Sequence, residues 1–288
     1  MNKFNYFLLF ILFGVYTPSF SQKKEKNESN NIKVKVMTFN IRYANPNDGD
    51  NIWGNREKLV YNVFKKYKCD FVGSQEVLPQ QLLDLKGNLP LYCYISRSRD
   101  KNPDKGEACP LFYITKKWKL IDSQTFWLSE TPAITGSKSW ESSLPRICTW
   151  GLFENKKTGF KLRVYNTHFD HRSQKAREES IKLIIRMIED HKKDSLPFIL
   201  MGDLNVEPDN MVIKKLNSLY TDSYKKNNQR SEPDYTFQGW DIKNKKRIDY
   251  IYTSKKIEVK KSIVIRFNRN GQYPSDHLPV YSKIKFIN

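Results

Sequence analysis

Met201-Gly202-Asp203-Leu204-Asn205 and Ser275-Asp276-His277-Leu278-Pro279-Val280 are the two stretches that decide the fold of this chain. In each of them an acid stands beside a second polar ligand or a base, next to an apolar run. A third acidic segment, Arg247-Ile248-Asp249-Tyr250-Ile251-Tyr252, lies between them. Carboxylates and a histidine at the ends of successive strands are what a hard divalent cation and an activated water require. The pattern therefore indicates metal-assisted hydrolysis of a phosphate ester.

Around these stretches, apolar periodicity predicts many strands and few helices. Lys33 to Asn40 alternates and then turns apolar, as the first strand of a sheet does. Gln174 to His191 is the longest amphipathic helix, with isoleucines along one stripe. Further strands are predicted at 71–73, 92–96, 111–115, 118–126, 147–154, 160–168, 198–201, 247–253, 257–266 and 280–286, and further helices at 56–66, 80–85 and 210–217. We expect an α/β (α+β) chain with two packed mixed β-sheets flanked by helices, a four-layer α/β/β/α sandwich.

The first 31 residues are expected to precede the folded domain. Residues 1–21 combine a basic start, a short apolar run from Phe7 to Val15 and small residues before Ser21, which is typical of a secretory signal peptide. The apolar run is too short to stay as a membrane-spanning anchor. Residues 22–31 are polar and predict a disordered linker, and 32–288 have the length of one catalytic domain. We expect a monomer that is secreted or periplasmic and has no stable membrane anchor.

The formal net charge of the chain is +19. Such a charge favours polyanionic partners, for example nucleic acid, anionic lipid or phosphorylated glycan. Many of the lysines stand in short runs, such as Lys116-Lys117 and Lys156-Lys157, that are equally typical of solvated turns. Charge therefore permits a polyanionic substrate without requiring one.

Four cysteines follow the predicted signal peptide: Cys69, Cys93, Cys109 and Cys148. An exported protein can form disulfides, and four cysteines allow three pairings. Cys93 and Cys109 stand on apolar segments that we place on neighbouring strands, so they are the favoured pair, with free buried thiols as the alternative. None has the spacing of a zinc site or a catalytic partner beside it.

The polar residues that follow apolar strands form a series: Asn40, Glu76, His168, Asp203, Asn205, Asp249, Asp276 and His277. They stand in Thr38-Phe39-Asn40-Ile41-Arg42, Ser74-Gln75-Glu76, Asn166-Thr167-His168, Gly202-Asp203-Leu204-Asn205, Arg247-Ile248-Asp249-Tyr250-Ile251 and Ser275-Asp276-His277. With these motifs in this order over Lys33 to Phe286, the chain resembles the endonuclease/exonuclease/phosphatase superfamily. It is most similar to a deoxyribonuclease-like, metal-dependent phosphoesterase, here as a secreted bacterial member.

The resemblance implies a metal site. Glu76 would be the main ligand of Mg²⁺, because a hard cation prefers carboxylate oxygen. Asn40 would orient the metal or a phosphate oxygen through its amide, and Asp276 would complete the site. Mn²⁺ is the expected substitute for Mg²⁺.

The resemblance also implies catalytic roles. His277 would be the general base that takes a proton from the attacking water, and Asp249 would hold its imidazole in the useful tautomer. Asp203 would position or deprotonate the water, and Asn205 would donate to the charge that develops on the phosphoryl group. His168 would stabilise the scissile phosphate or protonate the leaving oxygen.

Further candidates stand beside these motifs. By analogy with the deoxyribonuclease-like branch, Glu107 would orient His168. Arg146 is expected to clamp a phosphate of the substrate. Asp170 and His171 are assigned to substrate binding, with a polar loop that caps the helix at Gln174 as the alternative.

The leading hypothesis is a secreted Mg²⁺-dependent phosphodiester hydrolase, a nuclease that cleaves DNA or RNA by in-line water attack. The first alternative is a phosphatase or phosphodiesterase for a sugar phosphate, a phosphoinositide or sphingomyelin, because related folds keep their core and vary their loops. The second is a non-enzymatic polyanion-binding protein on the same scaffold. It is disfavoured because the acids and bases of the site are all present.

Overall fold

The structure is a computed structural model that describes Met1 and residues 32–191, 194–227, 235–240, 244–254 and 257–287. Apart from Met1, the signal peptide and the linker predicted for residues 1–31 lie outside the described residues, so both stay predictions.

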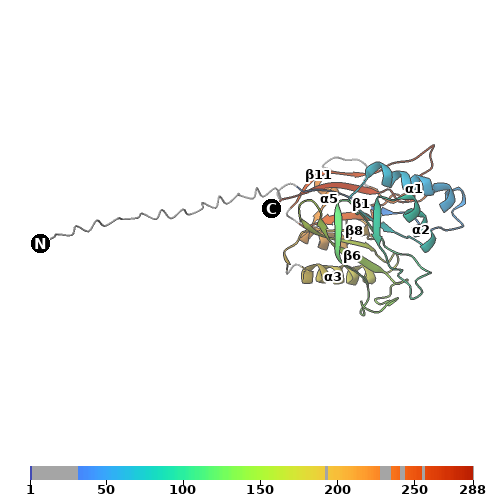
Figure 1. Ribbon diagram of the computed structural model, residues 1–288. Coiled ribbons are helices and arrows are strands. Elements are labelled where there is room, and N and C mark those ends of the chain that lie inside the picture. The colour runs from blue at the N-terminus through green and yellow to red at the C-terminus, as the bar shows by residue number, and fades with distance from the viewer. Residues whose placement is uncertain (2–31, 192–193, 228–234, 241–243, 255–256, 288) are drawn as a thin grey trace.

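Two six-stranded sheets form the centre of the molecule (Figure 1). The first has the order β11 (Ile257–Val264), β12 (Val280–Phe286), β1 (Lys33–Asn40), β2 (Phe71–Gln75), β4 (Leu111–Ile114) and β3 (Tyr92–Ile95). The second has the order β5 (Trp118–Trp127), β6 (Ile147–Asn155), β7 (Lys161–His168), β8 (Phe198–Asp203), β10 (Asp249–Thr253) and β9 (Thr221–Asp222). Both sheets are mixed, because β1 pairs parallel with β2 and β7 pairs parallel with β8, whereas the neighbouring pairs are antiparallel. The predicted pair of mixed sheets is confirmed.

Helices cover the outer faces of the two sheets. Figure 1 shows α1 (Trp53–Tyr67) and α2 (Pro79–Asn88) on one side and α3 (Gln174–His191) on the other. The remaining helices of the described part are the 3-10 helix η2 (Gly49–Asn51), α4 (Met211–Leu219) and α5 (Ser223–Asn227). No helix within the described ranges is long and apolar enough to cross a membrane.

Apolar side chains fill the space between these layers. Between the sheets, Phe71 of β2 packs against Phe153 of β6 with ring centroids 4.7 Å apart. On the outside of the first sheet, Phe64 of α1 meets Phe112 of β4 edge-on at 5.4 Å. Ile184 of α3 belongs to the corresponding cluster on the second sheet. Each such buried side chain contributes about 1.5–3 kcal/mol, so these three clusters hold the four layers together.

The structure differs from the predicted elements mainly at short segments. β9 and α5 are not predicted, because a strand of two residues and a helix of one turn are too short to show a hydrophobic period. α1 begins at Trp53 and not at Arg56, since Gly54 and Asn55 are poor helix formers and hide its first turn.

The predicted disulfide between Cys93 and Cys109 is wrong, because all four cysteines are free. β3 and β4 are neighbours as expected, but their register pairs Cys93 with Tyr113. Cys109 precedes β4 and is buried beside Trp127, whereas Cys93 is exposed. The two thiols therefore lie in different environments.

Candidate active site

The ends of the central strands bring the predicted residues together at one end of both sheets. His168 and Asp203 end the parallel strands β7 and β8 opposite each other, and Asp249 begins β10 opposite Asp203. In the first sheet Asn40 ends β1 opposite Gln75, which Glu76 follows directly. Parallel strands end at the same edge of a sheet, so side chains from distant parts of the sequence meet there.

Close contact between the sheets aligns these strand ends. Asn166 of β7 reaches across to the first sheet, where it accepts a hydrogen bond from Gln75 Nε2 at 2.6 Å. Gly73 makes room for it, because a Cβ there would lie 2.6 Å from Asn166 Oδ1. At Gly202, where φ is 154°, a Cβ would lie 2.0 Å from the carbonyl oxygen of Thr167. Both positions therefore require glycine.

Asp276 and His277 come from the turn before β12, which Ser275 ties to β1. Ser275 Oγ donates to the carbonyl oxygen of Asn40 at 2.8 Å and accepts from the backbone N–H of His277 at 3.2 Å. This turn therefore places Asp276 and His277 beside the end of β1 at Asn40.

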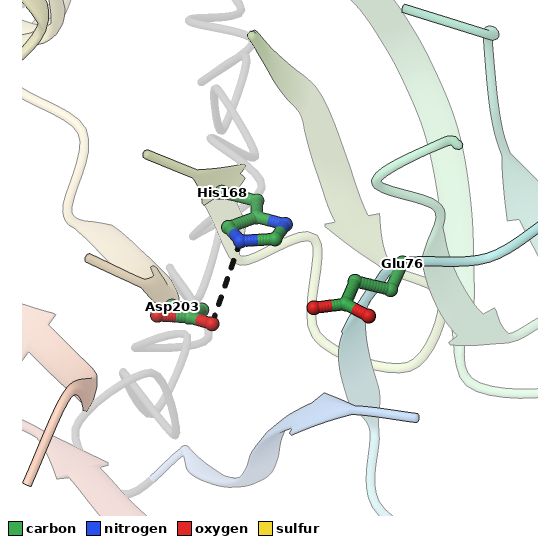
Figure 2. Close-up of side chains that lie close together, drawn as sticks. All are labelled: Glu76, His168 and Asp203. Carbon is green, nitrogen blue, oxygen red and sulfur yellow. Dashed lines mark ion pairs between the residues drawn. The ribbon is translucent and has the colours of Figure 1, made fainter. Parts of the chain in front are cut away.

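Glu76, Asn40 and Asp203 form one hydrogen-bonded cluster. Asn40 Nδ2 donates to Glu76 Oε1 at 2.9 Å and to Asp203 Oδ2 at 3.0 Å. Glu76 has φ of 60°, a left-handed conformation that costs a residue with a Cβ about 1–2 kcal/mol. A hydrogen bond from the backbone N–H of Tyr43 to Glu76 Oε2 at 3.2 Å helps to hold it. Figure 2 shows Glu76, His168 and Asp203 around a common space, with His168 Nε2 3.5 Å from Asp203 Oδ2.

His277 and Asp249, which were predicted to act as the base and its orienting acid, contact each other directly. His277 Nδ1 lies 2.9 Å from Asp249 Oδ2, and both side chains are buried. Because a carboxylate can only accept, the proton of this hydrogen bond belongs to Nδ1. His277 Nε2 is then directed toward Asp203, whose Oδ2 lies 3.7 Å away.

His168 is held by Asn205. The amide nitrogen of Asn205 donates to the carbonyl oxygen of Phe169 at 3.0 Å and lies 3.0 Å from His168 Nε2. Because the carbonyl oxygen of Phe169 can only accept, the group of Asn205 that faces it is the amide NH2. The same NH2 donates to His168 Nε2, so the ring proton of a neutral His168 is on Nδ1. The backbone N–H of Asn205 also donates to Asp203 Oδ1 at 2.9 Å.

Burial and neighbouring charges shift the pKa of both imidazoles in opposite directions. Burial lowers the pKa of His277, but contact with Asp249 and Asp203 outweighs burial and raises that pKa to about 10. Burial and the positive charge of Arg146 lower the pKa of His168 well below its usual value. The two histidines are therefore suited to different roles at the same phosphate.

The pKa values of three carboxyl groups in the site are also shifted. Burial raises the pKa of Asp203, and the negative charge of Asp249 raises it further. Burial raises the pKa of Asp276 as well, with Glu76 adding to it. For Glu76 itself burial is outweighed by His277 and the Asn40 hydrogen bond, which leave its pKa below the usual value.

This donor set fits a hard divalent cation. Single ligand atoms of Glu76, His168 and Asp203 lie within 4.8 Å of one another. Several buried carboxylates share this space. Burial first, and then the negative charges of Asp249 and Glu76, raise the pKa values of Asp203 and Asp276, and a bound cation would stabilise these carboxylates in their charged form. The predicted contact of Asn40 with the metal or a phosphate oxygen stays a prediction, because an amide oxygen has two lone pairs. The Asn40 oxygen already accepts from the backbone N–H of Arg42 at 3.0 Å, and its nitrogen positions Glu76.

A cavity of about 760 Å³ opens over the cluster. Of the predicted residues it is lined by Glu76, Glu107, Arg146, His168, His171, Asp203, Asn205, Asp276 and His277. Asn40, Asp249 and Asp170 are not among its lining residues. Sequence reasoning did not assign the other polar lining residues, Arg42, Tyr43, Arg172, Arg177, Glu207, Asp209, Asn210 and Lys246, to the site.

Glu107 lines the cavity but does not orient His168 as predicted. Its Oε2 lies 2.6 Å from Arg99 Nη1, and this ion pair is partly buried. Burial and the negative charge of Glu76 raise the pKa of Glu107 to about 6. The physical reason for the difference is that Arg99, which has no motif around it, offers a stronger partner than a neutral imidazole.

Asp170 lies behind the wall of the site and does not line the cavity. Its Oδ1 accepts from the backbone N–H groups of Arg172 and Ser173 at 2.9 and 2.8 Å. Its Oδ2 accepts from the backbone N–H of Ser143 at 2.9 Å and lies 3.7 Å from Arg146 Nε. The assignment of Asp170 to substrate binding is therefore wrong, and its role as a loop brace before α3 is the one observed.

Arg56 is a further residue that the sequence did not reveal. Its side chain is fully buried in α1 and donates to the carbonyl oxygens of Pro274 at 3.0 Å and of Arg42 at 2.8 Å. It thus ties the loop after β1 to the turn that carries Asp276. Nothing in the sequence marks it, whereas Glu207 and Asp209 could have been found from their place directly after the Asn205 motif.

Comparisons with known proteins agree with this geometry. Residues 37–277 match the model of the endonuclease/exonuclease/phosphatase family. A mannosyl-6-phosphatase from Bacteroides thetaiotaomicron is 37% identical, with 88% of this chain and 100% of that chain covered and a TM-score of 0.82. A family protein from the same organism is 36% identical (89% and 98% covered, TM-score 0.82), and one from Bacteroides vulgatus is 35% identical (88% and 99% covered, TM-score 0.83). No curated protein matches. The chain belongs to the endonuclease/exonuclease/phosphatase family of metal-dependent phosphoester hydrolases.

Proposed function

We propose that this protein is a phosphatase that releases inorganic phosphate from a phosphorylated sugar. The observation that carries the proposal is the 37% identity to a mannosyl-6-phosphatase, over 88% of this chain and 100% of that chain. A cavity of about 760 Å³ has the size of a site for one small molecule. Glu207 and Asp209 at its edge offer acceptors for hydroxyl groups, and Phe237 offers an apolar face. We therefore favour the small-substrate alternative over a nucleic-acid substrate.

The side chains of the site position the attacking water and the phosphate, and they transfer protons. Asp203 Oδ2 lies 3.7 Å from His277 Nε2, so it can hold an attacking water beside that imidazole. His277 donates from Nδ1 to Asp249, and in its neutral form it presents Nε2 to take the proton of that water. Because its pKa is raised, this neutral form needs a positive charge nearby, which a cation held by Glu76 and Asp276 would supply. Glu76 and Asp276 would hold Mg²⁺, which when bound polarises the phosphate and lowers the pKa of water.

The opposite side of the phosphate is served by His168 and Asn205. His168 carries its proton on Nδ1, and Asn205 fixes the ring through Nε2 at 3.0 Å. In this arrangement His168 stabilises the phosphate and assists departure of the sugar oxygen.

A nuclease is the second candidate, and the net charge of +19 favours it. The same residues would serve a phosphodiester, so the two candidates differ in the substrate and not in the catalytic groups.

The test compares both substrates in one preparation. Purified protein is incubated with mannose 6-phosphate and with supercoiled plasmid, in Mg²⁺ and then in EDTA, and released phosphate and nicked DNA are measured. Asp203→Asn serves as the inactive control. Metal-dependent phosphate release without nicking supports the phosphatase. Nicking that is lost in Asp203→Asn, without phosphate release, refutes it and establishes the nuclease.

A further inference from the structure

We infer that Arg146 and His171 form a clamp for the terminal oxygens of a phosphomonoester, and that this clamp makes the enzyme prefer monoesters to diesters. The inference rests on the proposed function, in which the cavity holds one phosphorylated small molecule. Arg146 and His171 are the residues that would restrict the site to such substrates.

Arg146 has hydrogen-bond donors that the protein leaves unused. The residue directly precedes β6, lines the cavity and is only 4% exposed. Within the described residues its Nε and Nη1 have no hydrogen-bond partner, and the carboxylate of Asp170 stays 3.7 Å from Nε. Buried donors are normally satisfied, and a guanidinium can only donate. The unused donors therefore require an acceptor that the folded chain does not provide, and a phosphate oxygen in the cavity supplies one.

His171 adds a second donor beside Arg146. Arg146 Nη2 lies 2.9 Å from His171 Nδ1, and because the guanidinium must donate, Nδ1 accepts. The ring proton of a neutral His171 is then on Nε2. His171 also lines the cavity, so Nε2–H and the guanidinium can bind two oxygens of one phosphate.

A packed ion pair stands near Arg146 in the wall of the cavity, and we expect it to exclude a second ester group. Arg99 and Glu107 form an ion pair of 2.6 Å there, with side chains only 10% and 16% exposed. Trp127 supports the wall from behind by donating from Nε1 to the carbonyl oxygen of Arg99 at 2.6 Å. A terminal phosphate oxygen on this side meets donors, whereas the second substituent of a diester meets a packed wall.

Charge favours the same substrate. Arg146 and His171 line the same cavity as His168, which lies 3.5 Å from Asp203 in the catalytic cluster, so the clamp shares its cavity with the reacting phosphate. A phosphomonoester carries up to two negative charges at neutral pH, whereas a diester carries one. A clamp with an arginine therefore gains more from the monoester.

The test is the ratio of kcat/KM for p-nitrophenyl phosphate to kcat/KM for bis(p-nitrophenyl) phosphate. Arg146→Lys keeps the charge but loses the planar fork of donors, and His171→Gln removes the imidazole. Arg186→Lys, on an exposed residue of α3, is the matched control. We expect the wild type to prefer the monoester, and Arg146→Lys to lower its kcat/KM on the monoester by about 10-fold or more while the diester changes less than about 3-fold. His171→Gln should show the same pattern with a smaller loss.

Inhibition by inorganic phosphate gives a second readout that is independent of turnover on the diester. The inhibition constant of phosphate should rise by about 10-fold in Arg146→Lys and stay unchanged in Arg186→Lys. A wild type that prefers the diester, an equal loss on both esters, or unchanged phosphate inhibition would overturn the clamp. If Arg146→Lys does not fold, the same ratio of kcat/KM values is measured for His171→Gln, which changes an exposed residue. Failure to hydrolyse mannose 6-phosphate would refute the proposed sugar substrate, whereas the ratio would still test the clamp.

Discussion

Asp170 joins three segments of the active-site wall, and the size of the effect of Asp170→Asn on stability follows from its contacts. The side chain is buried, braces the loop before α3 with its Oδ1 and faces Ser143 and Arg146 with its Oδ2. Asparagine keeps one acceptor oxygen but removes the charge opposite the buried Arg146. Removing one partner of a buried ion pair costs about 3–5 kcal/mol, and we expect the lower end because some acceptors stay. At about 2–4 °C per kcal/mol for a domain of this size, Tm should fall by about 6–12 °C.

Thermal unfolding followed by circular dichroism measures this loss, and its pH dependence tests the cause. Burial raises the pKa of Asp170, but hydrogen bonds from Ser143 and Ser173 outweigh burial and hold it below the usual value. A lowered pKa in the folded state gives stability that is present above about pH 4 and is lost as the pH falls further. The gap between wild type and Asp170→Asn should therefore be constant from pH 5 to about 8 and narrow below about pH 4. Asp190→Asn, exposed on α3, should change stability by less than about 0.5 kcal/mol. A loss below about 1 kcal/mol at pH 7, or a gap that widens in acid, would refute the reasoning.

Three further substitutions test other parts of the structure. Gly202→Ala should lower the free energy of unfolding by about 2–4 kcal/mol in urea, because its Cβ would lie 2.0 Å from the carbonyl oxygen of Thr167, and a neutral result would contradict that close approach. Arg56→Lys should cost about 2–4 kcal/mol, because one ammonium cannot replace the guanidinium that reaches Pro274, and an unchanged urea midpoint would show that this tie is dispensable. His277→Ala should lower turnover on p-nitrophenyl phosphate by about 100-fold or more with folding intact, and unchanged turnover would remove His277 from the mechanism.

The strand-end residues were predictable because each stands where an apolar run stops. Asp203 ends the buried strand β8, and Asn40 ends a strand that alternates at first and is then continuously buried. Such runs predict strands, and the mixed order of two sheets then brings the polar ends to one edge. The contact between His168 and Asp203 therefore follows from the register of two parallel strands alone.

The partners of buried charges could not be predicted in this way. Glu107 stands in a short motif, yet the residue that binds it, Arg99, lies in a loop without any period. Arg56 lies in the first turns of an amphipathic helix, where a charged residue normally faces solvent, and only the three-dimensional packing buries it. Loop conformation decides such pairs, and periodicity carries no information about it.

The most direct test of metal-dependent hydrolysis at the Glu76 cluster is phosphate release from mannose 6-phosphate as Mg²⁺ is added, in the wild type and in Glu76→Gln. Glutamine keeps the shape of Glu76 and its hydrogen bonds in part, but it removes the charge that a hard cation requires. We expect saturable activation of the wild type, loss of activity in EDTA, and for Glu76→Gln a Mg²⁺ requirement raised by about 10-fold or more together with lower turnover. Full activity of the wild type in EDTA, or the same Mg²⁺ dependence in both proteins, would contradict the account.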